Sequence, residues 1–213
     1  MKIMYSALSS YSNKTRHMSM AEARFVHNIP GQTVVDIYVN QRLVLSGVRY
    51  KGVSDFFSFN LGVLDVQVKV SGTNNIIAEG VLNLGASKYT LIIHGKGPYS
   101  ILALEDSTQC PMPGMALVRV IHAAADAPAV DIYANNQIKL FSNISYGSAG
   151  SPLYASVNPG NYKINVVPAN SFSSVLDVNI SLASGAIYTV IASGIPGDRM
   201  YPLNLIVSLD GSC

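Results

Sequence analysis

Residues 117–135 read LVRVIHAAADAPAVDIYAN, and a less regular copy of this stretch, ARFVHNIPGQTVVDIYVN, occupies residues 23–40. Matching positions in the two stretches are 95 residues apart (122 − 27 = 95). A fixed offset between similar stretches indicates two copies of one structural unit. The pairs that keep this offset are His27 and His122, Asp36 and Asp131, Tyr38 and Tyr133, and Asn40 and Asn135.

The offset also predicts the domain organisation of the 213-residue chain. Two units of about 90–100 residues are each long enough to bury a core of their own. We expect a first domain over residues 23–105 and a second over residues 117–213. The stretch between them, residues 106–116, contains prolines and a glycine and is typical of a short linker. Residues 1–22 lack a sustained pattern and are assigned to an N-terminal tail.

Both units consist of short runs rich in Val, Ile, Leu, Phe and Tyr, which are bounded by Gly, Asn, Pro or Ser. Regular short runs without a helical period predict an all-β sandwich. Asn40-Gln41 and Asn135-Asn136 interrupt two such runs, and asparagine tolerates the positive φ that tight hairpins require. The expected strands are residues 23–27, 33–39, 42–45, 53–59, 64–70, 76–84, 89–94 and 100–104 in the first unit, and 117–122, 129–134, 137–141, 152–157, 162–167, 175–182, 187–192 and 203–209 in the second.

The charge content is more informative than the net charge of +2, which gives no reason to expect binding to nucleic acid. Charged residues make up 12% of the chain, against about 25% in typical soluble domains. Two interpretations remain open. The surface is polar but uncharged, as in many secreted β-proteins, or neighbouring subunits of an assembly cover much of it.

The sequence contains no apolar run long enough to span a membrane. The first residues form a poor secretory signal, because their apolar patch is short and interrupted. Residues 1–22 are therefore either a disordered leader or a donor strand that extends the open sheet edge of a partner.

The runs VRVIHAAADAPAVDIYANN, NPGNYKINVVPA and SGAIYTVIASG together resemble the bacterial domain-of-unknown-function family 4397. The second unit carries the resemblance at Asp126, Ala127 and Pro128, whereas the first has Ile29, Pro30 and Gly31 near that place. The resemblance implies two tandem immunoglobulin-like antiparallel β-sandwich domains that are surface-associated. It supplies no catalytic residue.

His27 and His122 are the most conspicuous polar residues of the repeat. Alternation along their strands places each histidine on the core side, at a strand end. The interpretation we favour is a structural hydrogen bond from His27 to Asp36 and from His122 to Asp131. A metal site is less well supported, because His-x8-Asp is not a recognised ligand spacing. Asp126, in the loop AAADAP, alone makes a weak calcium candidate.

No motif for a catalytic nucleophile or for phosphate binding is found in the sequence. We therefore expect no catalytic residue, no metal and no cofactor. Five tyrosines fall in or near expected loops and edges, where tyrosine suits a protein or glycan interface as well as an ordinary strand position. They are Tyr50, Tyr146, Tyr154, Tyr162 and Tyr201.

Cys110 and Cys213 each follow the last expected strand of their unit. They either pair with one another, cross-link subunits, or stay as free thiols, and either bond requires an oxidising compartment.

The function we expect is a non-enzymatic structural subunit of an extracellular or cell-surface assembly, such as a filament, coat or matrix. Its partners would be copies of itself, and other surface proteins or glycans are second candidates. The alternatives are a monomeric adhesin or ligand-binding module that uses the tyrosine-bearing loops and, third, an enzyme of unrecognised type.

Overall fold

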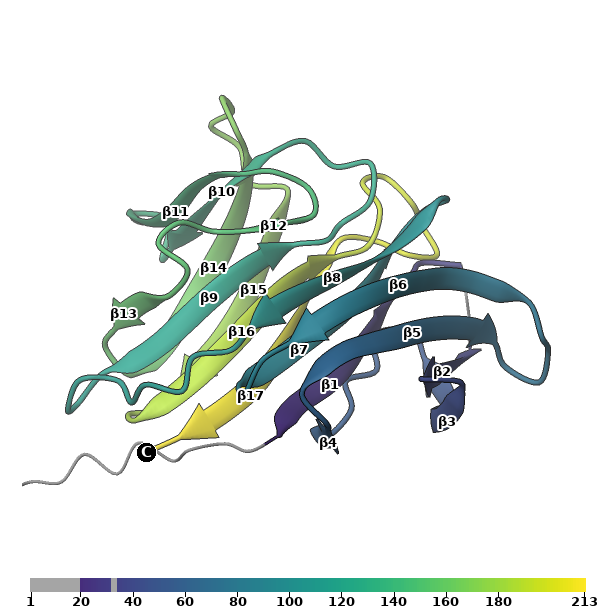
Figure 1. The fold of residues 1–213 in the computed structure, drawn as a ribbon. Helices are drawn as coiled ribbons and strands as arrows, with labels where there is room; N and C mark the ends of the chain where they lie inside the picture. Colours follow the sequence, from purple (N-terminus) through teal and green to yellow (C-terminus); the bar gives the residue numbers. More distant parts are fainter. Residues whose placement is uncertain (1–19, 32–33) are drawn as a thin grey trace, which may run out of the picture.

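The structure is a computed structural model that describes residues 20–31 and 34–213. All seventeen elements in this part of the chain are β-strands (Figure 1). They form four sheets, and each half of the chain contributes two of them. The predicted all-β fold with two sandwiches is confirmed.

The first sandwich contains one sheet with the strand order β4-β1-β7-β8 and another with the order β3-β2-β5-β6. Its strands are β1 (Ala21–Asn28), β2 (Val34–Val39), β3 (Arg42–Arg49), β4 (Phe57–Phe59), β5 (Gly62–Val70), β6 (Ile76–Leu84), β7 (Lys88–Gly95) and β8 (Tyr99–Glu105).

The second sandwich repeats this plan with the sheets β12-β9-β16-β17 and β11-β10-β14-β15, and β13 also pairs with β9. Its strands are β9 (Ala116–His122), β10 (Val130–Ala134), β11 (Ile138–Ile144), β12 (Ser148–Ala149), β13 (Ala155–Val157), β14 (Gly160–Pro168), β15 (Leu176–Leu182), β16 (Ala186–Ser193) and β17 (Asn204–Ser212).

Most strands overlap the predicted ranges, but the expected strands 53–59 and 152–157 are shortened to β4 and β13, of three residues each. Three further differences concern β1, the direction of strand pairing and β12. Strand β1 begins at Ala21, so the last two residues assigned to the tail belong to the first sheet. β1 pairs with β7 in parallel, as β9 does with β16, so the sheets are not purely antiparallel. β12 was not predicted, because two residues carry no periodic signal. The donor-strand tail lies almost entirely outside the described residues.

Both predicted hairpin turns are confirmed by their backbone geometry. Asn40 and Gln41 have φ values of 49° and 64°, and Asn135 and Asn136 have values of 53° and 60°. Two successive residues with positive φ match the twist of the flanking strands.

Each sandwich encloses its own apolar core, because alternate side chains of a strand point to opposite faces of its sheet. In the first sandwich Phe25 of β1 and Leu91 of β7 meet Ile37 of β2. In the second, Val120 of β9 and Ile132 of β10 occupy the corresponding space.

A third apolar cluster lies between the two sandwiches. Val26 and Ile92 come from the outer face of sheet β4-β1-β7-β8, and Ile121, Ile191 and Ile206 come from sheet β12-β9-β16-β17. The four sheets therefore stack as successive layers, with these two sheets in the middle. Strands that are buried on both faces read as continuous apolar runs, which explains why β1 and β9 show little alternation.

Gly194, after β16, adopts a φ of +94°, and a Cβ atom there would overlap the carbonyl oxygen of Pro202. Gly197 in the same loop has a φ of +74° and open space around it. Gly197→Ala should therefore cost only the backbone term of about 1–2 kcal/mol.

Gly194→Ala should cost about 1–3 kcal/mol more than Gly197→Ala, because the loop must also move away from the new methyl group. Urea unfolding of both variants measures the difference. Equal losses would show that the close approach of Pro202 is unimportant.

Candidate functional site

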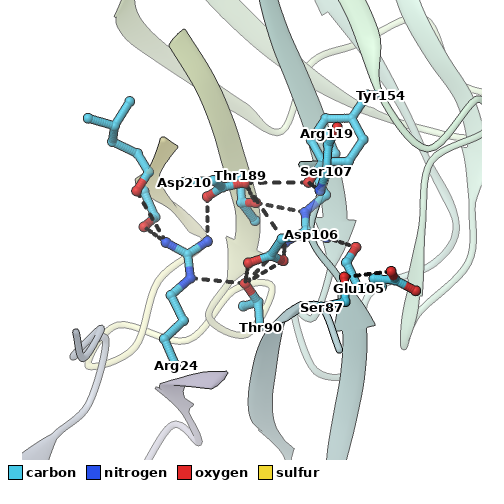
Figure 2. Close-up of polar contacts among 12 residues, drawn as sticks. Arg24, Ser87, Thr90, Glu105, Asp106, Ser107, Arg119, Tyr154, Thr189 and Asp210 are labelled. Atoms are coloured by element: carbon cyan, nitrogen blue, oxygen red, sulfur yellow. Dashed lines mark hydrogen bonds and ion pairs between the residues drawn. The ribbon is translucent and has the colours of Figure 1, made fainter. Parts of the chain in front are cut away.

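A group of buried polar side chains lies between the two sandwiches (Figure 2). At its centre are Arg24 of β1 and Arg119 of β9, which are 95 residues apart (119 − 24 = 95) and only 2% and 0% exposed. Each arginine points away from the core of its own sandwich, because its neighbours on either side in the strand face that core. The two guanidinium groups therefore meet at the interface between the domains.

Each arginine binds an aspartate at the end of the other sandwich's last strand. Arg24 Nη2 donates to Asp210 of β17, and Arg119 Nη2 donates to Asp106, directly after β8. All four side chains are at most 2% exposed. Removing one partner of such a pair leaves a charge buried without compensation, which is strongly destabilising.

Two threonines complete the network. Arg24 Nε donates to Thr90 Oγ1 at 2.9 Å, and Arg119 Nε donates to Thr189 Oγ1 at 2.7 Å. Each threonine hydroxyl donates in turn to the aspartate of its own sandwich, at 2.8 Å from Thr90 and 2.5 Å from Thr189. The network thus repeats itself about a local two-fold relation between the domains.

An aromatic ring covers each guanidinium group. Phe56 lies 5.1 Å from Arg24, and Tyr154 lies 5.3 Å from Arg119, within the range of cation–π attraction. The Tyr154 hydroxyl also accepts a hydrogen bond from the backbone N–H of Ser107 in the linker, at 3.1 Å. Burial raises the pKa of the Tyr154 hydroxyl to about 12, so this tyrosine stays neutral.

The charges of the network balance, since two guanidinium groups face two carboxyl groups. Burial raises the pKa of Asp210, and Arg24, the Thr189 hydroxyl and Arg119 oppose this rise. Side chains that are fully enclosed and bonded to one another have no access to a substrate. The arrangement therefore fastens the two sandwiches together and does not form a catalytic centre.

A second pair of polar contacts extends the interface toward the loops. The Tyr50 hydroxyl lies 2.9 Å from Ser193 Oγ, and the Tyr146 hydroxyl lies 2.8 Å from His94 Nδ1. Tyr50 is the counterpart of Tyr146, and His94 that of Ser193, so this contact also follows the internal repeat. Asn28 Nδ2 donates to the Ala123 carbonyl oxygen at 2.8 Å in the same region.

The predicted bond between His122 and Asp131 is wrong. His122 Nε2 lies 2.9 Å from the Pro128 carbonyl oxygen, whereas Lys139 Nζ and the Asn143 N–H donate to Asp131. The physical reason is strand alternation: Val130 and Ile132 face the core, so Asp131 points to the other face of its sheet. The two residues are close in the sequence, but in the fold His122 is on the core side and Asp131 is on the outer side of its sheet.

Asp36 occupies the same outward position in the first sandwich. Its carboxylate accepts hydrogen bonds from Ser46, Gly47, Ser71 and Gly72. Burial raises the pKa of Asp36, but the Gly47 N–H and the hydroxyl groups outweigh it and hold the pKa below the ordinary value. Asp36 thus fastens two loops of its own sheet.

His27, by contrast, lies on the inner side of the first sandwich. The backbone N–H of Ile29 donates to His27 Nδ1 at 3.4 Å. His27 thus lies on the core side of its sandwich and Asp36 on the outer side, as His122 and Asp131 do in the second unit.

Cys110 and Cys213 form a disulfide with their Cα atoms 5.8 Å apart. The bond ties the linker to the end of β17 and leaves neither sulfur atom for a bond between subunits. Closing a loop with a sequence separation of 103 residues is expected to stabilise the fold by about 4–5 kcal/mol in the chain-entropy model.

Three of the five loop tyrosines make contacts between the sandwiches, and Tyr154 contacts the linker and Arg119 of its own sandwich. Tyr50 packs edge-on against Tyr201, with ring centroids 5.6 Å apart, and Tyr146 and Tyr154 make the contacts described above. Tyr162 bonds to the Asn158 carbonyl oxygen within its own domain. These contacts leave less of the tyrosine surface for a ligand than the sequence suggested.

The described residues contain no group of three or more His, Cys, Asp or Glu side chains that could hold a metal ion. Asp126 pairs with Lys96 across the domain boundary at 2.6 Å, on the exposed surface. In residues 20–31 and 34–213, no helix is long and apolar enough to cross a membrane.

The outer edges of the stack offer a different kind of site. β6 is the last strand of its sheet and has no second hydrogen-bonded neighbour among the strands that the structure describes, although β8 of the facing sheet packs near it. Its nine residues, IIAEGVLNL, contain one charge, Glu79, and neither lysine nor proline. An unprotected edge with apolar side chains is a template for pairing with another chain.

The outer face beside this edge carries two exposed valines among polar neighbours, since Val81 pairs with Asp65 and is flanked by Glu79 and Asn83. Val81 of β6 is 73% exposed, and Val63 of β5 is 65% exposed. They are diagonal neighbours, because Val63 pairs with Asn83 and Val81 pairs with Asp65. Exposed β-branched residues at such diagonal positions form a small apolar patch.

The equivalent edge of the second sandwich, β15, is polar. The repeated tyrosines Tyr38 and Tyr133 lie in line, across the paired strands, with Glu79 of β6 and Asp177 of β15. Two residues further along, Asn179 is therefore the counterpart of Val81. Asp177 on the same face pairs with Lys163 at 2.7 Å. The two sandwiches thus share a fold but differ in what their outer edges present.

Sequence reasoning missed the buried network, although a signal was present. Arg24 and Arg119 interrupt apolar strands at the same repeat position, and Thr90 and Thr189 are another repeated pair, 99 residues apart (189 − 90 = 99). A charge kept in both copies of a strand that is apolar on both faces indicates a buried partner. The identity of that partner depends on how the domains dock, which no local pattern encodes.

These features define a protein of two tandem β-sandwiches that are packed into one unit. The family model described as "domain of unknown function (DUF4397)" matches the chain twice, over residues 21–133 and residues 116–206. The chain therefore belongs to this family, as the resemblance of its two repeats predicted.

No curated protein matches the chain. Among solved structures, a similar one is that of the Bacillus anthracis TIE protein. It shares 10% sequence identity at a TM-score of 0.27, and the match covers 83% of this chain and 34% of that one. The chain thus spans about a third of the length of that structure, and a likeness at this level carries no functional argument.

The buried network predicts a large difference between two otherwise similar substitutions. Asp106→Asn removes the nearer carboxylate of Arg119 and leaves only Asp210, at 3.9 Å, so it should lower the free energy of unfolding by about 3–5 kcal/mol. Asp126→Asn removes one partner of an exposed pair and should cause no measurable loss. Urea unfolding followed by circular dichroism compares them, and similar stability of the two variants would contradict the assigned role of Asp106.

Burial lowers the pKa of His94 and of His122, so the folded state binds fewer protons at these sites than the unfolded state. Stability should therefore be lost as the pH falls below about 6.5, the unfolded value of histidine. Urea unfolding at about pH 7.5 and pH 5 measures this loss. His94→Gln should make it smaller, and an unchanged loss in that variant would exclude His94 as a cause.

Proposed function

We propose that this protein is a non-enzymatic structural subunit of an extracellular or cell-surface assembly, and that copies of it associate through β6. The observation that carries the proposal is the edge of the first sandwich, where a nine-residue strand without lysine or proline lies beside the exposed Val63 and Val81. Soluble proteins usually protect such an edge with charges, prolines or a covering segment.

Pairing of two β6 strands would satisfy their outward-facing backbone groups and bury the apolar patch at the same time. Main-chain hydrogen bonds then supply affinity, while the side chains on either side set the register. Two antiparallel β6 strands would form a closed two-fold dimer. A filament, coat or matrix needs a second contact on each subunit, for which the tail before β1 remains a candidate.

The rigid connection between the sandwiches supports a structural role. The buried network, the apolar cluster and the disulfide each join parts of both halves of the chain or its linker. Two domains usually move relative to one another when their interface is small and polar. Here the interface is partly apolar, and the disulfide between Cys110 and Cys213 holds the chain next to it, so such motion is restricted. When the two sandwiches keep a fixed relative position, every subunit presents its contact surfaces to its neighbours at the same angle, as a regular assembly requires.

The disulfide supports the proposed location. Structural disulfides persist in oxidising compartments and are rare in the cytosol. Together with the low charge content of 12%, this favours an exported protein whose surface is polar and uncharged or covered by neighbouring copies.

The proposal predicts that the protein self-associates and that the β6 edge controls this. Val81→Lys replaces an exposed valine beside β6 with a charge and should weaken association by tenfold or more, since the apolar contact is lost and like charges would meet across a two-fold contact. Asn179→Lys, the same change at the equivalent position of β15, should leave association unchanged. Sedimentation velocity over a range of protein concentrations measures both.

A wild-type protein that stays monomeric at about 0.5 mM would overturn the proposal, because millimolar affinity is too weak for a stable assembly. Equal effects of the two lysine substitutions would show instead that added charge, and not the β6 edge, is responsible.

A further inference from the structure

A cavity of about 280 Å³ opens at one end of the second sandwich. It lies between the two sheets, where the loop after β9 meets the loops after β14 and β16. Its wall is mostly aliphatic, with Ala124, Val130, Val166, Leu176 and Leu203 among the lining residues. The lining contains no Lys, Arg, Asp or Glu.

The first sandwich shows why the second one has room here. Ala124 is the second residue after His122, and Ile29 is the second residue after His27, at the same offset of 95 (124 − 29 = 95). Both side chains belong to the core of their own sandwich and are at most 1% exposed. Where the first unit fills its core with an isoleucine, the second has only a methyl group.

The histidine beside this position also differs between the two units. In the first sandwich the backbone N–H of Ile29 donates to His27 Nδ1 at 3.4 Å. In the second, His122 Nδ1 is buried and has no hydrogen-bond partner among the described residues. An acceptor that is enclosed without a partner costs free energy, so native proteins rarely keep one without a reason.

The chemistry of the free nitrogen follows from its neighbour in the ring. His122 Nε2 lies 2.9 Å from the Pro128 carbonyl oxygen, which only accepts, so Nε2 carries the hydrogen. The ring is 1% exposed, and burial lowers the pKa of His122, so the ring is neutral at physiological pH. Nδ1 is therefore a bare lone pair that needs a donor.

We propose that this cavity is a binding site for a small, uncharged and largely apolar molecule that carries one hydroxyl or N–H donor. The aliphatic wall receives the apolar body, and His122 Nδ1 accepts the single hydrogen bond that orients it. Pockets of this kind combine an apolar lining with a few polar groups that fix orientation. A charged ligand is excluded, because nothing in the lining would compensate its desolvation.

The repeat itself indicates that the cavity is specific to the second unit. The two histidines and the loop lengths from His to Asp are alike, whereas the core residue Ile29 is replaced by Ala124 and the loop between β16 and β17 is longer than that between β7 and β8. A cavity that is open in the second unit and filled in the first is consistent with a ligand that binds only the second unit.

The test is a titration with the matched probes p-cresol and toluene, followed by ¹H–¹⁵N NMR shifts at Ala124, Ala192 and Ser193. p-Cresol should bind the wild-type protein with a dissociation constant below about 1 mM. Toluene, which lacks only the hydroxyl group, should bind about three- to tenfold more weakly, the ratio expected for one net hydrogen bond.

Ala124→Ile is the informative variant, because the first sandwich already holds an isoleucine at this position. It should abolish binding of both probes. His122→Phe should keep the apolar wall and remove the acceptor, so that the preference for p-cresol over toluene disappears. Val81→Lys lies on the other sandwich and should bind both probes like the wild type, which separates this site from self-association.

Absence of shift changes in the wild type at about 10 mM p-cresol would overturn the proposal, since such a cavity should retain an apolar probe of this size. Equal binding of the two probes to the wild type would overturn the role of His122. Both results come from the wild-type protein and do not depend on whether the variants fold.

Discussion

The structure depends on the exchange of two buried ion pairs between its halves. Arg24 of the first sandwich binds Asp210 of the second, and Arg119 of the second binds Asp106 after the first. Within its own sandwich each arginine reaches a threonine hydroxyl, and only Arg119 has a carboxylate, Asp210, at the longer distance of 3.9 Å. Each sandwich alone would therefore leave a poorly paired charge on an otherwise apolar outer sheet. Packing of the two sandwiches against each other brings a carboxylate to each arginine. Such ion pairs require a defined geometry, whereas apolar packing does not.

This constraint explains several features that look unrelated in the sequence. The outer faces of β1 and β9 are apolar around the arginines because they lie against the other domain. The linker is short, yet it carries Asp106, which is 3% exposed and completes the network. The disulfide between Cys110 and Cys213 closes the chain just beyond the two aspartates. The two inner sheets are thus occupied by contacts between the domains. The outer edges and the cavity remain for interactions with other molecules.

The sequence was sufficient to predict local structure, because its determinants are local. Short apolar runs between turn residues located most strands, and Asn40-Gln41 identified a hairpin through its tolerance of positive φ. The 95-residue offset revealed the repeat. The bond between His122 and Asp131 was predicted wrongly because spacing along the chain does not state which face of a sheet a side chain occupies.

Longer-range features needed the structure. Arg24 and Arg119 could be recognised as repeated charges, but their partners lie 186 and 13 residues away and belong to the opposite sandwich. Ile29 and Ala124 differ by three carbon atoms in the sequence, and only the fold shows that these atoms fill one core and are missing from the other. The apolar edge at β6 likewise becomes visible only when the strand order is known.

The claim that the two sandwiches form one cohesive unit is tested most directly by differential scanning calorimetry of the oxidised chain. If the exchanged ion pairs hold the domains together, both should unfold in one transition, with a calorimetric enthalpy equal to the van't Hoff enthalpy. Two separate transitions, or a calorimetric enthalpy about twice the van't Hoff value, would show that the sandwiches unfold independently and would contradict the account.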